Sequence, residues 1–448
     1  MSNLFYNEWS SSIFSKGAGG DFETPANQQY MEDTRKGHPL FEVEYASRCP
    51  YPSWSRWDCF YNSTYHEALD VKFSAPTISF PAMIPTVDGT LSVQQVERTS
   101  PVLLPDAELY DYRAQKLYAV FSQFNIATTD QLVAWTGMNR DDVEKGLNIL
   151  YSSGVVLSGG DSWVHKPSSG DIWMMKIASP EARRYYEGLD PLSRVLTLGV
   201  DVNDIETPVG SNSPSAVRHN MFISEMCLRI MENSDNIVTA WGDYFGAESR
   251  FHDPLDSVAR RHNHGDAILV TNNGSLVILE LSTSHASSRA GLEMFLNKAA
   301  AWVGVIANSD LDISVIFVDT RWRTNRNVLY RGVFSGIMDA SKPYANNELS
   351  RQQALGHIGI ANAAWWFPRP GATSKAASRL MAFSPSEYRF KAFDQPDPEF
   401  SSSSVRRNVV INSALALHRP PWVGEEPSLR EYDMGVSKSH EDSIRRMM

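Results

Sequence analysis

The stretch HNHGDAILVTNNGSLVILELSTSH, from His262 to His285, carries the strongest structural signal in the chain. Two aliphatic runs, Ala267–Val270 and Leu276–Leu281, flank the sequence Asn272-Asn273-Gly274. Asn and Gly tolerate the positive φ angles of tight turns, and aliphatic β-branched runs favour strands. The stretch therefore predicts a hairpin of two adjacent antiparallel strands.

Regular elements are predicted on both sides of this hairpin. Apolar residues at helical spacing favour one helix from Pro214 to Ile230 and another from Leu292 to Ile306. Apolar runs at residues 236–241 and 313–318 favour one strand before the hairpin and one after the second helix. The predicted order is helix, strand, hairpin, helix, strand.

Two carboxylates mark the hairpin, with Asp266 just before its first strand and Glu280 near the end of its second. Carboxylates on neighbouring strands can share a divalent cation, because Mg²⁺ prefers hard oxygen ligands. Asp266 and Glu280 have this placement, and the core that the arrangement resembles uses carboxylates so placed as metal ligands. The alternative interpretation is that both are polar residues at strand ends.

This arrangement resembles the PD-(D/E)XK, or restriction-endonuclease-like, core. The resemblance implies that Asp266 and Glu280 bind Mg²⁺, that Glu225 on the first helix is an additional acidic residue, and that a lysine follows the glutamate by two positions. Ser282 occupies that lysine position. Lys298 on the following helix is the candidate replacement, and the alternative is that it faces solvent. Because a serine hydroxyl cannot supply positive charge, we expect a degenerate core with weak or absent cleavage.

A zinc site is a rival interpretation of the same stretch. His262, His264 and Asp266 alternate, so they would share one face of a strand, as in the HxHxDH motif of metallo-β-lactamase-like hydrolases. Ala267 stands where that motif has its last histidine. Surface or phosphate-contacting histidines are therefore the favoured interpretation, and His285 has no assigned role.

A second periodic segment lies between residues 106 and 190. It predicts three short helices followed by two strands, at residues 117–124, 128–135, 139–150, 155–157 and 172–177. A further helix is predicted to begin at Ser179 and Pro180.

This order resembles a winged helix-turn-helix domain. The resemblance implies that the third helix enters the major groove of DNA and offers Arg140 and Lys145 to it. Further phosphate contacts are expected from the wing and the next helix, at Lys166, Lys176, Arg183 and Arg184. The third helix also carries acidic residues that phosphates repel, at Asp141, Asp142 and Glu144. A protein-docking or purely structural role for this helix is therefore the equal alternative.

The chain is predicted to be a multidomain protein of the α+β or α/β class, with a winged helix-turn-helix domain and a mixed sheet flanked by helices. The predicted parts are an irregular aromatic-rich N-terminal arm, the winged-helix domain, the PD-(D/E)XK-like domain and a C-terminal arm with little regular structure, at residues 1–105, 106–190, 191–345 and 346–448. The aromatic residues of both arms predict that the arms pack on the protein's own core or on a partner.

Composition narrows the class of partner. The 448 residues carry a formal net charge of -11, which excludes a protein that coats nucleic acid, so any DNA contact must be local. The three cysteines do not supply a thiolate metal site with paired ligands. No apolar run is long enough to cross a membrane, and no secretory signal pattern opens the sequence. We therefore expect no membrane partner and a cytoplasmic location.

From residue 106 to about residue 320, the two segments together resemble the replication-relaxation proteins of actinobacterial plasmids, integrative elements and phages. The resemblance implies a DNA-associated protein that acts in replication, transfer or DNA processing within a bacterial host. If the core is active, it is a divalent-metal-dependent DNA endonuclease. The alternative is a virion-associated structural or assembly component that reuses both folds as a scaffold and contacts neighbouring subunits, or copies of itself, through its terminal arms.

Overall fold

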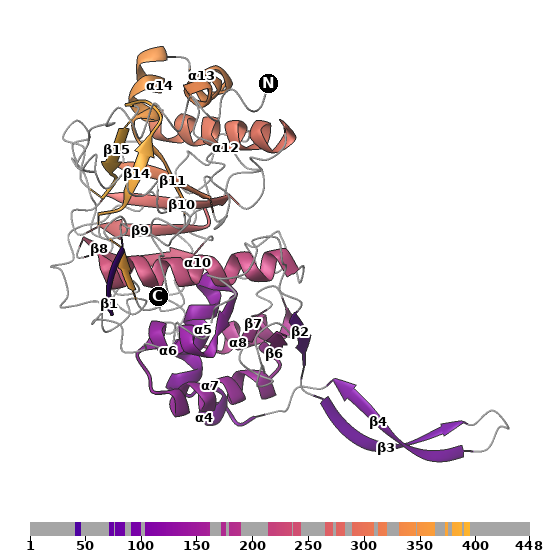
Figure 1. Ribbon diagram of the computed structural model, residues 1–448. Helices are drawn as coiled ribbons and strands as arrows, with labels where there is room; N and C mark the ends of the chain where they lie inside the picture. The colour runs from indigo at the N-terminus through magenta and orange to yellow at the C-terminus, as the bar shows by residue number, and fades with distance from the viewer. Residues whose placement is uncertain are drawn as a thin grey trace. The chain divides into compact units, whose positions relative to one another are not determined.

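In the computed structural model the chain divides into two compact units, the sheet unit of residues 1–67 and 222–448 and the helical unit of residues 68–221. Both units contain helices and strands, so the protein belongs to the α+β class (Figure 1). The structure describes residues 41–45, 71–75, 77–85, 91–99, 104–161, 172–175, 179–189, 214–234, 236–242, 265–271, 275–282, 289–308, 312–319, 331–345, 347–362, 372–374, 379–387 and 389–394. Within these ranges no helix has the length and apolar character that crossing a membrane requires.

The helical unit combines short helices with antiparallel strands. Its helices are α4 (Asp106–Leu109), α5 (Tyr112–Phe124), α6 (Thr129–Thr136), α7 (Arg140–Ser152) and α8 (Pro180–Gly188). One sheet has the order β2-β6-β7-β5, formed by β2 (Val71–Ser74), β5 (Ile126–Thr128), β6 (Val156–Asp161) and β7 (Ile172–Met175). A second sheet pairs β3 (Thr77–Pro85) with β4 (Leu91–Thr99).

Local capping sets the limits of α6 and α7. The Thr128 hydroxyl accepts a hydrogen bond from the Gln131 backbone N–H at 3.0 Å, and the Gln131 side chain accepts one from the Thr128 N–H at 3.1 Å. This capping box satisfies donors that the first turn of a helix leaves open. Gly137, with φ 66°, ends α6 in a conformation that suits glycine, and Asn139 caps α7.

Helices α5 and α7 approach closely because a glycine lies where they cross. A Cβ atom added at Gly146 would lie 2.7 Å from Cδ1 of Leu117 and 3.0 Å from the backbone carbonyl carbon of Arg113. Nearby, Phe124 at the end of α5 stacks on Trp135 of α6, with ring centroids 4.7 Å apart. The three helices therefore share one apolar core.

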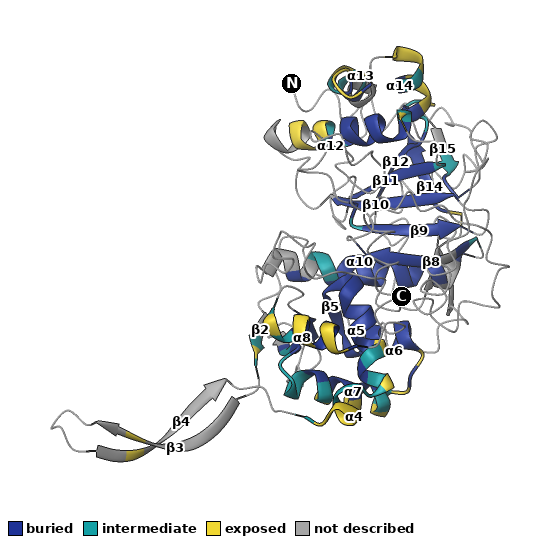
Figure 2. Cartoon of the chain, turned by 180° about the vertical axis from the view of Figure 1, so that it is seen from behind, coloured by how far each residue is buried: buried dark blue, intermediate teal, exposed yellow. Residues whose placement is uncertain are grey.

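The sheet unit is built on a seven-stranded mixed sheet with the order β15-β14-β12-β11-β10-β9-β8. Its strands are β8 (Ile237–Gly242), β9 (Ala267–Thr271), β10 (Leu276–Ser282), β11 (Ile313–Asp319), β12 (Ile358–Asn362), β14 (Met381–Ser384) and β15 (Arg389–Ala392). Strands β10, β11 and β12 run parallel, and the other neighbours are antiparallel. The central strands are buried along their length (Figure 2), which explains their continuous apolar sequences.

Helices cover this sheet. They are α10 (Pro214–Asn233), α12 (Arg289–Ala307), α13 (Arg331–Ala340) and α14 (Glu348–Leu355), and the division between the two units falls within α10. Helix α12 packs on β11 through Phe295 and Phe317, whose ring centroids lie 5.0 Å apart. Helices α13 and α14 pack against α12. A small separate sheet pairs β1 (Phe41–Tyr45) with β13 (Ala372–Ser374).

Residues after β15 tie together the two edges of the large sheet. Phe393 packs on the interior strand β12, where a Cβ atom added at Gly359 would lie 2.8 Å from the Phe393 ring. Asn236, which precedes the edge strand β8, donates a hydrogen bond of 2.8 Å to Asp394. Burial raises the pKa of the Asp394 carboxyl, against the lowering effect of the Asn236 hydrogen bond. The opposite edge strands β8 and β15 are thus linked through one buried carboxyl.

The expectation of an irregular segment at residues 1–105 was wrong for part of its length, because β1, β2, β3 and β4 lie there. The prolines Pro81 and Pro85 weakened the strand signal of β3, since proline is normally confined to edge strands or strand ends. Residues 68–105 also belong to the helical unit rather than to a separate arm.

The expectation of little regular structure at residues 346–448 was also wrong in part. Helix α14 and strands β12, β14 and β15 lie in this segment, and three of these elements complete the seven-stranded sheet. The stretch from His357 to Phe367 alternates between larger apolar and small or polar residues, which predicts a strand, and β12 (Ile358–Asn362) lies there. Strands β13, β14 and β15 are too short, at three or four residues each, to display a periodic pattern.

Replacing Gly146 with alanine should destabilise the helical unit, although alanine is the better helix former. The helix preference for alanine is worth up to about 1 kcal/mol. Overpacking against Leu117 and the Arg113 backbone costs about 1–3 kcal/mol and should prevail. Asn148→Ala, at an exposed position of the same helix, is the control and should be neutral. Urea denaturation followed by circular dichroism measures both, and unchanged stability of Gly146→Ala would contradict the close crossing.

Candidate functional site

The β9–β10 hairpin brings Asp266 and Glu280 to opposite positions on adjacent antiparallel strands. Ala267 pairs with Leu279, so the next positions outward are Asp266 and Glu280. The Asp266 N–H donates a hydrogen bond of 2.8 Å to the Leu279 carbonyl. The Leu281 N–H donates one of 2.5 Å to the Asp266 carboxylate. Asp266 is therefore anchored to β10 on both sides of Glu280.

Helix α12 supplies two partners to the Glu280 carboxylate. Trp302 donates from Nε1 to Oε1 of Glu280 at 2.6 Å, and Lys298 forms an ion pair with Oε2. Lys298 and Trp302 are four positions apart, so they lie on the same side of the helix. Glu280 is 1% exposed and Lys298 is 33% exposed, so the ammonium connects the buried carboxylate to the surface.

Burial dominates the electrostatics of this cluster. The pKa of Glu280 is raised to about 8, because burial and the neighbouring Asp266 carboxylate together outweigh the lowering effects of Lys298 and Trp302. Burial by itself would lower the pKa of Lys298, but the carboxylates of Glu280 and Asp266 outweigh it and raise that pKa above its usual value. The three ionisable side chains therefore act as one coupled group.

Glu225 and Cys227 lie two positions apart on α10, the helix that precedes β8. Burial raises the pKa of the Cys227 thiol, and the Asp266 carboxylate adds to the shift, so Cys227 is close to Asp266. A residue two positions away lies about 200° around a helix. Glu225 is such a residue, and its carboxylate accepts a hydrogen bond of 3.2 Å from Arg229. The contacts join Glu280 to Lys298 opposite Asp266, and they place Glu225 in a buried ion pair with Arg229.

The two hairpin carboxylates suit a magnesium ion better than a closed metal site. Among the described residues no group of three or more His, Cys, Asp or Glu side chains could hold a metal ion. Mg²⁺ commonly takes one or two carboxylates and completes its shell with water and substrate phosphate. Asp266 and Glu280 fit that pattern. The histidines at 262, 264 and 285 lie outside the described residues.

The basic residues of α7 are paired with carboxylates. Arg140 forms ion pairs with Asp130 at 2.7 Å and with Glu144 at 3.1 Å. Lys145 pairs with Asp142 at 3.7 Å. Exposed pairs of this kind contribute only about 0–1 kcal/mol each, but they cancel the charge that a phosphate would recognise.

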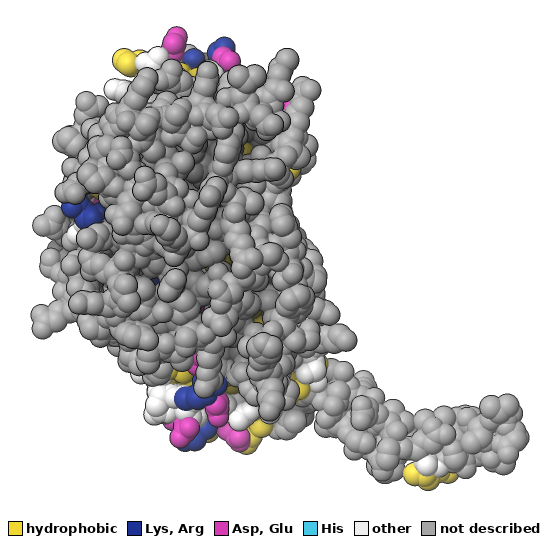
Figure 3. Space-filling view, in the orientation of Figure 1, with side chains coloured by type: hydrophobic (Ala, Val, Ile, Leu, Met, Phe, Trp, Pro, Cys, Tyr) yellow, Lys and Arg dark blue, Asp and Glu magenta, His cyan; other side chains and the backbone are white. Residues whose placement is uncertain are grey.

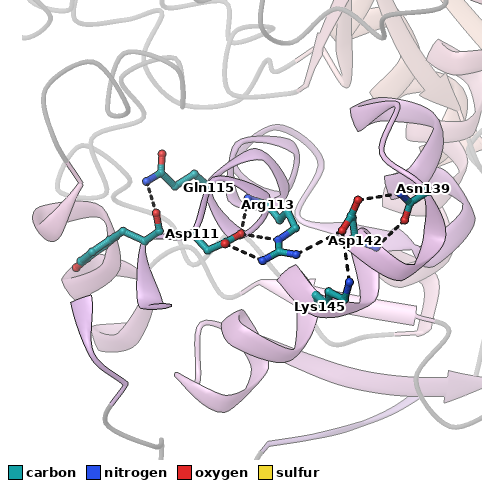
Figure 4. A network of polar contacts seen from close by, with 7 residues as sticks. Asp111, Arg113, Gln115, Asn139, Asp142 and Lys145 are labelled. Atoms are coloured by element: carbon teal, nitrogen blue, oxygen red, sulfur yellow. Dashed lines mark hydrogen bonds and ion pairs between the residues drawn. The ribbon is translucent and has the colours of Figure 1, made fainter. Parts of the chain in front are cut away.

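The same network extends to α5, as Figure 4 shows. Arg113 binds Asp111 at 2.8 Å and reaches Asp142 at 3.4 Å. The Arg113 hydrogen bond lowers the pKa of Asp111, and Asp111 in turn raises the pKa of Arg113. Asn139 donates to Asp142 at 2.8 Å. Figure 3 accordingly shows Lys and Arg side chains interleaved with Asp and Glu side chains around α4 and α7.

Helix α8 carries two arginines and two glutamates, and its arginines differ from the basic residues of α7 in having no ion pair with a described carboxylate. Ser179 caps it and Pro180 begins it, while Ala182 and Tyr185 face the core. Two exposed arginines lie between these buried residues, at Arg183 and Arg184. Neither forms an ion pair with any residue that the structure describes. Lys166 and Lys176 lie outside the described ranges.

Comparisons with protein-family models, with curated proteins and with solved structures find no match to this chain. The site is therefore interpreted from its own geometry.

Trp302 and Cys227 are the residues of this site that the sequence interpretation did not identify. Both are buried, and both belong to apolar stripes of helices. The four-residue spacing of Lys298 and Trp302 was the available signal, since it places a cation and an N–H donor on one side of α12.

Replacing Glu280 with glutamine should flatten the pH dependence of stability. An acid with a raised folded-state pKa stabilises the fold below its ordinary value of 4.5, and this contribution is lost as the pH rises toward about 8. The free energy of unfolding of the parent should therefore fall by up to about 1.4 kcal/mol per pH unit over this interval, and that of the variant should not. Urea denaturation with EDTA at several pH values measures the slopes.

Glu348→Gln, at an exposed position of α14, is the control for this measurement and should keep the slope of the parent. Parallel slopes for the parent and Glu280→Gln would mean that Glu280 ionises like an exposed glutamate.

Proposed function

We propose that this chain processes DNA, with a divalent-metal-dependent endonuclease core of the PD-(D/E)XK type in its sheet unit. The observation that carries the proposal is the ion pair of Lys298 with Glu280, opposite Asp266. This ammonium supplies the charge that Ser282 lacks. The order α10, β8, β9, β10, α12, β11 supports the same assignment, because that core has the order helix, strand, hairpin, helix, strand.

Each residue of the cluster has its own role. Asp266 and Glu280 would hold Mg²⁺ through carboxylate oxygens. When bound, Mg²⁺ polarises the phosphodiester and lowers the pKa of a bound water. Lys298 stabilises the negative charge that grows on the phosphate in the transition state. Trp302 fixes one oxygen of Glu280, so that the other is directed toward Lys298.

The helical unit is proposed to be a winged helix-turn-helix domain that contacts DNA through α8. Arg183 and Arg184 have no ion pair within the described residues, which supports this orientation, and the paired charges of α7 oppose the usual one. With a net charge of -11, contact is confined to such a local patch. This function fits a step in the replication or transfer of a plasmid, integrative element or phage in the cytoplasm of a bacterial host.

A second candidate function is favoured by the α7 surface. Its ion pairs with Asp130, Asp142 and Glu144 suit contact with protein better than contact with phosphate. In this alternative the chain is a structural or assembly component, of a phage particle for example, and both units serve as a scaffold.

DNA cleavage that depends on Mg²⁺ or Mn²⁺ should be lost when the cluster is broken. Asp266→Asn, Glu280→Gln and Lys298→Gln should each lower the rate by at least about a hundredfold, because each removes charge from the transition-state environment. Single-stranded and duplex DNA are the substrates, with EDTA as the blank. Lys342→Gln, which removes an exposed lysine paired with Asp339, is the control and should cleave like the parent.

Two results would change this assignment. A parent that binds DNA without cutting it would favour a silent core, and a parent that does neither would favour the scaffold. Cleavage that survives Lys298→Gln but not the carboxylate variants would leave the ammonium without a catalytic role.

DNA affinity should depend on α8 more than on α7. The double variant Arg183→Gln, Arg184→Gln should bind DNA more weakly. The slope of log affinity against log salt concentration should be shallower by roughly two, because binding through two fewer phosphate contacts releases fewer counterions from the DNA. The double variant Arg140→Gln, Lys145→Gln removes the same charge from α7 and should bind like the parent. Fluorescence anisotropy at several salt concentrations measures both, and the reverse ranking would assign the DNA contact to α7.

A further inference from the structure

Strands β3 and β4 form a ribbon that pairs only with itself in the described part of the chain. Each strand has nine residues, and they pair along their whole length, from Thr77 opposite Thr99 to Pro85 opposite Leu91. No third described strand joins this sheet (Figure 1). A lone two-stranded ribbon is marginally stable in water, whereas three or more strands support one another.

Two apolar side chains of this ribbon face solvent together. Met83 is 61% exposed and Val93 is 66% exposed. They are directly opposite each other on the two strands, so they form one apolar pair on one face of the ribbon. Burial of such a pair requires another surface.

The prolines of β3 close one of the two free edges of the ribbon. Pro81 and Pro85 lack an N–H group, and both keep their place in the regular ladder, opposite Gln95 and Leu91. Residues along an antiparallel strand alternate between inward-bonded and outward-facing backbone groups, so prolines fit the outward positions. The outer edge of β3 therefore lacks donors at two of its outward positions.

No strand in the described part of the chain pairs with the outer edge of β4. Its outward-facing backbone groups belong to the positions opposite those of β3, namely residues 91, 93, 95, 97 and 99. None of these residues is proline. An exposed edge of this length with unsatisfied donors and acceptors is a template for another strand.

The charge of the ribbon favours a protein strand over DNA. Residues 77–99 contain one basic residue, Arg98, and two acidic residues, Asp88 and Glu97. Ribbons that bind the DNA backbone need an excess of Lys and Arg. The occupant of the open edge is therefore a polypeptide strand.

We propose that β4 pairs antiparallel with β4 of a second copy of this chain, about a two-fold axis at Gln95. This register pairs all nine residues of β4 with their equivalents. It also joins outward positions to outward positions, 91 to 99, 93 to 97 and 95 to 95, which allows about ten hydrogen bonds. Registers centred on residues 94 or 96 also join outward positions, but they leave one end of β4 unpaired and allow only about eight hydrogen bonds.

The pairing converts two marginal ribbons into one four-stranded sheet. A two-fold axis perpendicular to the sheet keeps the faces of both ribbons aligned, so the two Met83–Val93 pairs lie on one face. Two-fold dimers are the commonest symmetric assemblies, and one self-complementary edge is sufficient to form them. This proposal does not rest on the nuclease function.

Sedimentation velocity of the full-length chain over a range of concentrations tests the pairing. The parent should dimerise as concentration rises. Gln95→Pro removes the central outward N–H of β4 and should raise the dimer Kd by at least about tenfold, a shift equivalent to one or two hydrogen bonds. Ser79→Pro is the matched control, because it adds a proline at an outward position of the already closed β3 edge and should leave the Kd unchanged.

Cysteine variants test the same axis without disturbing the ribbon backbone. Hydrogen-bonded antiparallel partners have Cα atoms about 5.5 Å apart, within the range of a disulfide. Mild oxidation should give a covalent dimer of Gln95→Cys and not of Ser79→Cys or of the parent, whose own cysteines are Cys49, Cys59 and Cys227.

Three results would overturn the proposal. The first is a parent that stays monomeric at high concentration, which would also be found if β4 accepts a strand from a different protein. The second is an equal loss of dimer in Gln95→Pro and Ser79→Pro. The third is equal cross-linking of the two cysteine variants.

Discussion

The buried carboxylate of Glu280 is the constraint around which the sheet unit is organised. Glu280 is 1% exposed within strands that are otherwise apolar, and a carboxylate removed from water is costly unless charge and hydrogen bonds replace the solvent. Helix α12 provides both, through Lys298 and Trp302. Meeting this requirement fixes the rotation of α12 above β10. It thereby also fixes which face α12 presents to α13 and α14, where Leu296 and Tyr344 fill the space beside glycines.

The hairpin and its carboxylates could be predicted because they are local patterns. A turn sequence between two aliphatic runs sets the register, and the register alone brings Asp266 opposite Glu280. The ion pair of Lys298 with Glu280 depends on how α12 is rotated about its axis. Sequence periodicity does not determine this rotation closely enough to place a residue at the border of the apolar stripe. Trp302 was missed because its indole counts as apolar, and only its N–H distinguishes it from other core residues. Strands β14 and β15 were not predicted, because such short strands are stabilised by pairing with distant segments and have no local sequence pattern.

Strands β3 and β12, in the two terminal segments, also show that a local sequence pattern does not reveal the place of a strand in its sheet. β3 contains prolines that argue against a central strand, yet they are compatible with a ribbon whose outer edge needs no donors. β12 is buried along Ile358–Ala361, and its alternating sequence predicts a strand without indicating that it lies inside a sheet. In both cases the residue types are correct for the position that each strand takes in its sheet. That position is a property of the fold and cannot be derived from one segment.

The effective charge of a helix depends on the ion pairs of its side chains, and this supports the proposed DNA contact through α8 rather than α7. In sequence, Arg140 and Lys145 of α7 look equivalent to Arg183 and Arg184 of α8. In the structure the first two are neutralised by neighbouring carboxylates, and a phosphate approaching them would also meet those acids. Breaking an exposed pair costs only about 0–1 kcal/mol, so desolvation is a minor barrier and repulsion by the released carboxylates is the larger one. Phosphate therefore gains more at α8, and an approach through α8 leaves the ion-paired surface of α7 for protein.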